Sequence, residues 1–368
     1  MMSSEKICNG TSAEVKETEE RYVAYVGTYT HGTSVGIHLY DVDVVHGTMA
    51  ERKVIPINNP SDLTVSKDGR FLYSIADEGV EAFRILPDGD LEPMNEAWIG
   101  GMRGCYVEVD DQNRYLFVAG YHDGRVTMMH LKEDGSIGGI ADGIFHQGMG
   151  RNIAERSSRP HVNCVMLTPV KQNYVCAVDG GLDHVKIYQL DYEQGKMKIA
   201  DILRCPLDSA PRMLRFTKDG RFAYVLCELR NAVDVYQYEC TSKGPVFEFV
   251  QSIPTVAESD MTSNGASGME LTEDGRYLYC SNAGTNTVII YEVNQETGIL
   301  TKLCSSTVSG DYPKTLGLFP DGKHFVSLNH DSNEMTLFRV DYEKKIFLME
   351  AKPIQIETPN CIHIHKLR

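Results

Sequence analysis

The stretch SAPRMLRFTKDGRFAYVLCE, residues 209–228, has the pattern of two short strands joined by a tight turn. Apolar residues alternate on both sides of Asp219-Gly220, a dipeptide typical of two-residue β-hairpin turns. In an antiparallel pair the start of one strand lies beside the end of the next. Arg212 and Glu228 are therefore predicted to share one edge of the sheet, and we place the chemistry of the protein at that edge.

The same hairpin recurs along the chain, at intervals of about 45 to 60 residues. Three further copies keep an Asp-Gly pair, and they cover residues 60–73, 267–279 and 313–323. Two weaker copies, residues 104–118 and 160–178, replace that pair by Gln112-Asn113 and Lys171-Gln172. A repeat of this length is typical of propeller blades rather than of helical solenoids.

Each hairpin is followed by a third alternating strand and then by a more polar fourth one; examples of the third strand are residues 80–85, 185–190, 233–238 and 288–293. The N-terminal segment has only three strands, at 22–28, 36–43 and 49–57, whereas one strand is left over at 359–364. We therefore predict one all-β domain over residues 21–368, a seven-bladed β-propeller of four-stranded antiparallel blades. Its C-terminal strand is expected to join the N-terminal blade and close the ring.

Composition limits the partners and the compartment. The formal net charge of −15 argues against a nucleic-acid or anionic-membrane partner. The ten cysteines show no C-x-x-C pair, as expected for buried, reduced thiols in a cytoplasmic protein. Residues 1–20 are polar and lack the apolar core of a signal peptide, so we predict a disordered tail. No stretch reaches the roughly 18 apolar residues of a membrane-spanning helix.

Aligning the hairpins predicts two rings of side chains at one mouth of the central channel, which the innermost strand of each blade should line. The positions equivalent to Arg212 are Asn360, Ser61, Cys105, Asn163, Ser267 and Lys314. The positions equivalent to Glu228 are Tyr29 or Thr28, Asp77, Tyr121, Gly180, Ala283 and His330. Most of these residues are polar or aromatic, which suits either a ligand site or a solvated surface.

The largest departure from the repeat is the segment GMGRNIAERSSR, residues 148–159, which precedes the fourth blade. We expect it to enter that blade at the same end of the propeller as Arg212. Long loops on a rigid scaffold often carry function, and a plain insertion is the alternative.

Several further motifs are distinctive: residues 25–30 (YVGTYT), 152–155 with 160–162 (PHV), 181–183 (GLD), Pro211-Arg212 with Cys227-Glu228, and Ser281-Asn282. Together they resemble those of the seven-bladed propeller lactonases, a family that includes bacterial 6-phosphogluconolactonases of the propeller type and fungal carboxy-cis,cis-muconate cyclases. The resemblance covers nearly all of the chain after the N-terminal tail.

In that family a His, two Arg and a Glu around the channel mouth are regarded as the active-site set. The resemblance assigns the Glu to Glu228, one Arg to Arg212, and the first His of a His-x-His motif to His161. The second His of that motif is Asn163 here, and the other Arg, which normally follows Ser-Asn, is Ala283. The resemblance therefore implies a modified site.

The first functional hypothesis is an enzyme of carbohydrate metabolism that hydrolyses a sugar lactone such as 6-phosphogluconolactone. Opening a lactone requires a base to activate water and a positive group where the carbonyl oxygen gains charge. Glu228 would be the general base, Arg212 the carbonyl stabiliser, and His161 an acid or a ligand contact. The substrate-binding residues would be Asn163, Tyr121 and Asp77, together with Lys314 and His330, which would hold a phosphate.

Two other hypotheses use the same pocket. A muconate-type lactonising cyclase would move a proton with Glu228 or His161, but Ala283 removes one of the Arg that would hold a dicarboxylate. A catalytically diverged propeller would instead bind a small anion or a protein partner, since fold does not decide function. The changes at Asn163 and Ala283 favour this last reading, whereas the retained Arg212, His161 and Glu228 favour the enzyme.

We expect no cofactor and no metal. No glycine-rich phosphate loop precedes a helix, and the family reaction needs no redox group. His363 and His365 alternate on one strand, but two ligands near a C-terminus are usually incidental. The expected partner is thus a small anionic or sugar-lactone substrate, with no nucleic acid and no membrane. The sequence carries no indication of the oligomeric state.

Overall fold

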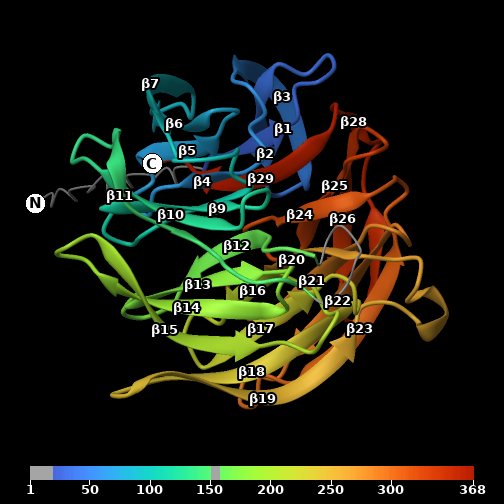
Figure 1. Ribbon diagram of the computed structural model, residues 1–368. Coiled ribbons are helices and arrows are strands. Elements are labelled where there is room, and N and C mark those ends of the chain that lie inside the picture. The colour runs from blue at the N-terminus through green and yellow to red at the C-terminus, as the bar shows by residue number, and fades with distance from the viewer. Residues whose placement is uncertain (1–19, 151–157) are drawn as a thin grey trace, which may run out of the picture.

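The computed structural model describes residues 20–150 and 158–368, and these fold into antiparallel sheets arranged around a ring (Figure 1). Blade 1 comprises β29 (Pro359–Lys366), β1 (Tyr22–Thr28), β2 (Gly36–Asp43) and β3 (Thr48–Pro56). Blade 2 comprises β4 (Leu63–Val65), β5 (Phe71–Ile75), β6 (Gly79–Ile85) and β7 (Leu91–Trp98). Blade 3 comprises β8 (Tyr106–Val109), β9 (Tyr115–Gly120), β10 (Arg125–Leu131) and β11 (Ile137–Phe145).

The other blades repeat this order from the channel outwards. Blade 4 comprises β12 (Val162–Leu167), β13 (Tyr174–Asp179), β14 (His184–Asp191) and β15 (Lys196–Arg204). Blade 5 comprises β16 (Pro211–Phe216), β17 (Phe222–Cys227), β18 (Ala232–Thr241) and β19 (Gly244–Pro254). Blade 6 comprises β20 (Ala266–Leu271), β21 (Tyr277–Asn282), β22 (Thr287–Val293) and β23 (Leu300–Thr307). Blade 7 comprises β24 (Pro313–Leu318), β25 (His324–Asn329), β26 (Glu334–Asp341) and β27 (Ile346–Met349), and β28 (Ile354–Gln355) also pairs with β26.

The C-terminal strand closes the ring, as predicted. Strand β29 pairs antiparallel with β1, from Tyr22 opposite Lys366 to Gly27 opposite Cys361. In Figure 1 the red β29 accordingly lies with the blue strands of the first blade. Each innermost strand contacts the innermost strand of the next blade, and β29 contacts both β24 and β4. The seven-bladed architecture is confirmed, whereas residues 1–19 of the predicted tail and residues 151–157 of the long loop lie outside the described residues.

The hydrophobic core is divided among the interfaces between neighbouring blades. Between blades 5 and 6, for example, Tyr224 and Leu226 pack with Met269 and Tyr291. Buried tyrosines add a hydrogen bond to each of several interfaces, since the Tyr224 hydroxyl donates to the Gly298 carbonyl at 3.2 Å in the next blade. Equivalent bonds join Tyr25 to Gly89 and Tyr73 to Gly135. A blade is therefore stabilised mainly by its two neighbours.

The Asp219-Gly220 turn differs from the two-residue turn that we predicted. Gly220 has a φ of 70°, but Asp219 is not among the residues with positive φ, which a type I′ turn would require. The turn instead spans Thr217 to Gly220, whose N–H donates to the Thr217 carbonyl at 2.9 Å. The Thr217 hydroxyl donates to Asp219 at 2.7 Å and accepts the Phe222 N–H at 3.1 Å. This side-chain bonding favours the longer turn.

The structure bears on two expectations from composition, the state of the cysteines and the presence of a membrane-spanning helix, for the residues that it describes. The described cysteines are all free thiols, and most of them are buried. The helical content of the described chain is one short 3-10 helix, Glu258–Asp260, and no helix in that part of the chain is long and apolar enough to cross a membrane.

Candidate active site

The central channel contains a cavity of about 940 Å³, lined by residues from all seven innermost strands and from nearby loops. The lining includes every member of the ring that we predicted from Arg212, namely Ser61, Cys105, Asn163, Arg212, Ser267, Lys314 and Asn360. Of the second predicted ring, Tyr29, Tyr121 and Glu228 line the cavity. The ring predicted from Arg212 is thus found on the cavity wall, whereas Asp77, Gly180, Ala283 and His330 of the second ring are absent from the described lining.

A β-bulge sits at the ring position in most of the blades. In blade 5 the register passes from Pro211 opposite Cys227 to Met213 opposite Leu226, which leaves Arg212 without a partner across the ladder. The same shift occurs at four other ring residues: Asn163, Ser267, Lys314 and Asn360. A bulge redirects a side chain and is common beside functional sites. Here it directs the ring residues towards the channel.

Arg212 and Glu228 form an ion pair at this mouth. Arg212 Nη1 lies 2.9 Å from Glu228 Oε2, and Arg212 Nε donates to the Ser267 carbonyl at 2.7 Å. Both side chains are largely buried, with 23% and 11% of their surface exposed. Burial is the largest single influence and opposes the charge of Arg212, but the Glu228 carboxylate, together with smaller contributions such as that of Tyr312, raises the pKa of the guanidinium. The contact predicted from the hairpin is therefore present.

Two further cationic side chains, Lys314 and Arg103, lie close to the ring of Tyr29. Lys314 Nζ lies 4.7 Å from the ring centroid, and the Arg103 guanidinium lies 5.2 Å from it. Lys314 also donates to Asn360 Oδ1. Burial, and then the nearby charge of Arg212, lower the pKa of Lys314 to about 8. The mouth thus concentrates positive charge in a chain whose formal net charge is −15.

Three predicted site residues, His161, Asp77 and His330, are absent from the described residues that line the cavity. His161 is 2% exposed and stacks on Tyr121, with 4.3 Å between the ring centroids. Its Nδ1 lies 2.8 Å from the Tyr121 carbonyl oxygen. Asp77 accepts a hydrogen bond from Arg103, and the ring of His330 meets Tyr29 edge-on. Each of the three therefore contacts a residue that does line the cavity.

Asn163 and Ala283, the two positions at which the chain differs from the family pattern, lie differently with respect to the cavity. Asn163 lines the cavity, and its amide donates to the carbonyls of His161 and Pro211, both at 3.4 Å. Ala283 is absent from the described residues of the lining, and its N–H donates to the Gly265 carbonyl at 2.9 Å.

Sequence reasoning missed several residues of the lining. Arg103, His122 and Tyr312 reach the mouth from loops that the hairpin alignment did not cover. Deeper in the channel, Arg215 Nη2 lies 2.7 Å from Glu270 Oε1, and Arg215 Nη1 donates to the Tyr106 hydroxyl at 3.4 Å. Arg215 had a signal in the sequence, because it alternates with Met213 on the innermost strand and both line the cavity.

Known proteins are similar to this chain in both sequence and fold. Residues 23–364 match the family described as lactonase, 7-bladed beta-propeller. The 6-phosphogluconolactonase of Bacillus subtilis (strain 168) is 30% identical over 348 residues, which cover 93% of this chain and 98% of that protein. The 6-phosphogluconolactonase of Formosa agariphila is 25% identical over 333 residues, covering 87% of this chain and 92% of that protein.

Among solved structures, the periplasmic gluconolactonase PpgL of Pseudomonas aeruginosa superposes with a TM-score of 0.87 at 25% sequence identity. The superposition covers 95% of this chain and 100% of that one. The matched residues include every ring position at the channel mouth, since they extend from residue 23 to residue 364. The chain therefore belongs to the seven-bladed β-propeller lactonase family.

Proposed function

We propose that this protein hydrolyses a sugar lactone of the 6-phosphogluconolactone type at the mouth of the channel, with Glu228 as general base and Arg212 as stabiliser of the carbonyl oxygen. The observation that carries the proposal is the Arg212–Glu228 ion pair, 2.9 Å long, on the wall of a cavity that also holds Lys314 and Arg103. It places a base and a cation side by side, as lactone hydrolysis requires.

The reaction follows from these two groups. The Glu228 carboxylate removes a proton from a water molecule while the water oxygen attacks the lactone carbonyl carbon. The carbonyl oxygen gains negative charge, and Arg212 Nη2 offers two further N–H groups with which to stabilise it. When the carbonyl re-forms, the ring C–O bond breaks and the leaving ring oxygen takes the proton from Glu228. The product is the open-chain hydroxy acid, and the base returns to its ionised form.

The cations around Tyr29 suit the anionic end of a phosphorylated sugar. Lys314 and Arg103 flank one aromatic ring, so a phosphate placed there would meet a point charge and a planar guanidinium. His330 packs edge-on against the same ring and Asp77 holds Arg103, so both would support this subsite from behind. We therefore propose a phosphate subsite at Tyr29, next to the reacting carbonyl at Arg212.

His161 is better suited to positioning than to direct proton transfer. It is 2% exposed and lies behind Tyr121, whose ring lines the cavity. We propose that His161 holds the Tyr121 ring and backbone in place, with Asn163 supporting the same strand edge through its bonds to the carbonyls of His161 and Pro211.

The test is hydrolysis of freshly prepared 6-phosphogluconolactone and of gluconolactone, with the spontaneous rate subtracted, by the wild type and by Glu228→Gln. General-base catalysis contributes about 100- to 10,000-fold, so the variant should lose at least ~100-fold in kcat. Glu273→Gln is the matched control, because the Glu273 side chain is 85% exposed and, among the described residues, forms an ion pair only with the exposed Lys218. A preference for the phosphorylated lactone would support the subsite at Tyr29.

A diverged propeller that binds an anion without turnover is the second candidate, favoured by Asn163 and Ala283 at the usual His and Arg positions. It predicts that neither lactone is hydrolysed faster than in buffer, while 6-phosphogluconate still binds at the mouth. The lactonising cyclase ranks third, because Ala283 supplies no cation for a second carboxylate. We further propose a cytoplasmic location, which the free thiols of the described cysteines support.

A further inference from the structure

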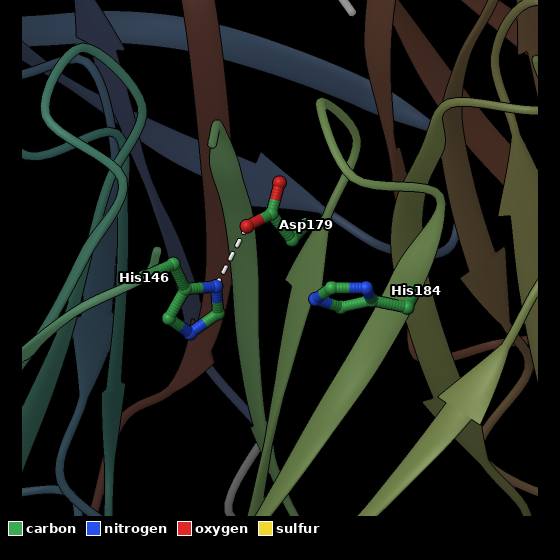
Figure 2. Close-up of side chains that lie close together, drawn as sticks. All are labelled: His146, Asp179 and His184. Carbon is green, nitrogen blue, oxygen red and sulfur yellow. Dashed lines mark hydrogen bonds and ion pairs between the residues drawn. The ribbon is translucent and has the colours of Figure 1, made fainter. Parts of the chain in front are cut away.

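Three ligand-type side chains gather where blades 3 and 4 meet, outside the channel. His146 directly follows β11, Asp179 ends β13, and His184 begins β14. One ligand atom from each lies within 4.8 Å of the other two. Figure 2 shows the two imidazole rings on either side of the Asp179 carboxylate, with one ring nitrogen of His184 pointing towards the other two side chains. None of the three belongs to the described lining of the channel cavity.

The cluster leaves two buried nitrogen atoms unsatisfied. The side chains of His146 and Asp179 have no exposed surface. The Nε2 atoms of His146 and His184 are both buried, and neither has a hydrogen-bond partner among the described residues. Leaving a buried polar atom unpaired costs free energy, so both atoms call for an explanation. The nitrogen of His146 that faces Asp179 is Nδ1, whereas the ring nitrogen of His184 that points towards the other two side chains would engage a bound cation directly.

The carboxylate of the cluster is held in place by the main chain. Asp179 Oδ1 accepts the N–H groups of His161, Gly181 and Leu182 at 2.9, 3.0 and 3.1 Å. Asp179 Oδ2 lies 2.6 Å from His146 Nδ1. Ligating groups in metal sites are commonly oriented by such outer hydrogen bonds, which fix the ligand before the metal arrives. Asp179 therefore has the support expected of a ligand.

We propose that His146, Asp179 and His184 bind a divalent transition-metal cation, with Zn²⁺ as the best match, at the seam between blades 3 and 4. Two imidazoles and one carboxylate are ligands that zinc accepts. With bonds of about 2.0 to 2.1 Å, a tetrahedral zinc keeps its ligand atoms ~3.3 Å apart. The cluster spans up to 4.8 Å, so binding needs side-chain shifts of about 1 Å, chiefly at the half-buried His184.

The metal would act structurally rather than on the substrate. The site is buried, and it joins the end of β11 in blade 3 to β13 and β14 in blade 4. It is also linked to the candidate active site, because Asp179 accepts the backbone N–H of His161. A bound cation would therefore stabilise the seam and the backbone that carries His161.

The experiment titrates the full-length protein, freed of metal by a chelator, with Co²⁺ followed by visible absorption, and then displaces Co²⁺ with Zn²⁺. We expect one equivalent, with visible ligand-field bands and without the intense near-ultraviolet bands of cobalt thiolates, since the proposed ligands contain no cysteine. His184→Gln and His146→Gln remove proposed ligands and should weaken zinc binding by more than the about 10- to 100-fold that loss of an outer-shell partner costs. Zinc should raise the thermal unfolding midpoint of the wild type and of neither variant.

His365→Gln is the matched control, since His363 and His365 form another close histidine pair, with ring centroids 6.4 Å apart. It should bind zinc like the wild type. The proposal is overturned if the wild type binds no stoichiometric metal, if His184→Gln retains wild-type affinity while folded, or if His365→Gln loses it. Because the readouts are metal binding and thermal unfolding, the result does not depend on whether the protein hydrolyses a lactone.

Discussion

Arg212, the residue that the bulge at the start of β16 leaves outside the ladder, forms an ion pair with Glu228, directly after β17, with 2.9 Å between Nη1 and Oε2. Without the bulge, Arg212 would pair in register with a residue of β17 rather than turn towards the channel. The backbone irregularity and the ion pair are thus one feature. It sets the base and the cation of the proposed reaction at the same point of the cavity wall.

Arg212→Gln should lower kcat for lactone hydrolysis by about 100- to 1000-fold, the cost typical of removing one oxyanion-stabilising donor. The loss should appear in kcat more than in KM, because the oxygen gains its charge only in the transition state. Arg221→Gln is the control, since Arg221 pairs with Asp219 at the exposed turn of the same hairpin. Unchanged kcat in Arg212→Gln would remove Arg212 from the reaction.

Binding of 6-phosphogluconate should weaken as the pH rises through about 8, the pKa of Lys314. A bound phosphate favours the charged ammonium, so binding is strongest below that pKa and falls by up to ~10-fold per pH unit above it. The phosphate itself titrates near pH 6 and is already dianionic in this range. Calorimetric titration between pH 7 and 9.5 measures the effect.

Two comparisons identify the group responsible. Lys314→Met should bind 6-phosphogluconate weakly and without the decline near pH 8, and gluconate should show no such decline with the wild type. If Lys314→Met keeps the wild-type pH dependence, the phosphate subsite at Tyr29 is misplaced.

The fold was readable from the sequence because a propeller repeats one local pattern. The predicted strands at 22–28 and 36–43 coincide with β1 and β2, and the leftover strand beginning at Pro359 is β29. The hairpin alignment also located on the cavity wall every residue of the ring predicted from Arg212. These predictions needed only periodicity and the rule that antiparallel neighbours meet end to start.

The irregular parts of the structure could not be predicted from the sequence. The bulges at Asn163, Arg212 and Lys314 could not be recognised from the alternation of apolar residues. Each bulge adds one residue at the very start of a strand, where too few residues precede it for a shift in the alternation to show. The turn at Asp219 followed side-chain hydrogen bonds of Thr217 rather than the dipeptide rule. His146 and Asp179 are 33 residues apart, and only the meeting of two blades brings them together.

Thr217→Val should destabilise the protein by about 1–2 kcal/mol, because it removes a hydroxyl that accepts the Phe222 N–H and donates to Asp219 in a partly buried turn. Thr217→Ser keeps both bonds and should cost far less; Ser66 makes the equivalent bonds in blade 2. Equilibrium unfolding in urea measures both variants. If Thr217→Ser destabilises the protein as much as Thr217→Val, the two hydroxyl bonds contribute no more than the methyl group that Ser lacks.

His161→Gln distinguishes positioning from proton transfer. Because His161 lies behind Tyr121, with 4.3 Å between the ring centroids, we expect the substitution to disturb the cavity wall and lower kcat/KM. The shape of the pH–rate profile should be kept, since a positioning residue donates no proton to the substrate. Loss of one limb of that profile would instead make His161 a direct acid or base. Tyr121→Leu, which removes the stacked ring itself, should reproduce the kinetic loss, and the two substitutions combined should cost little more than either alone, because residues that act through one contact are not additive.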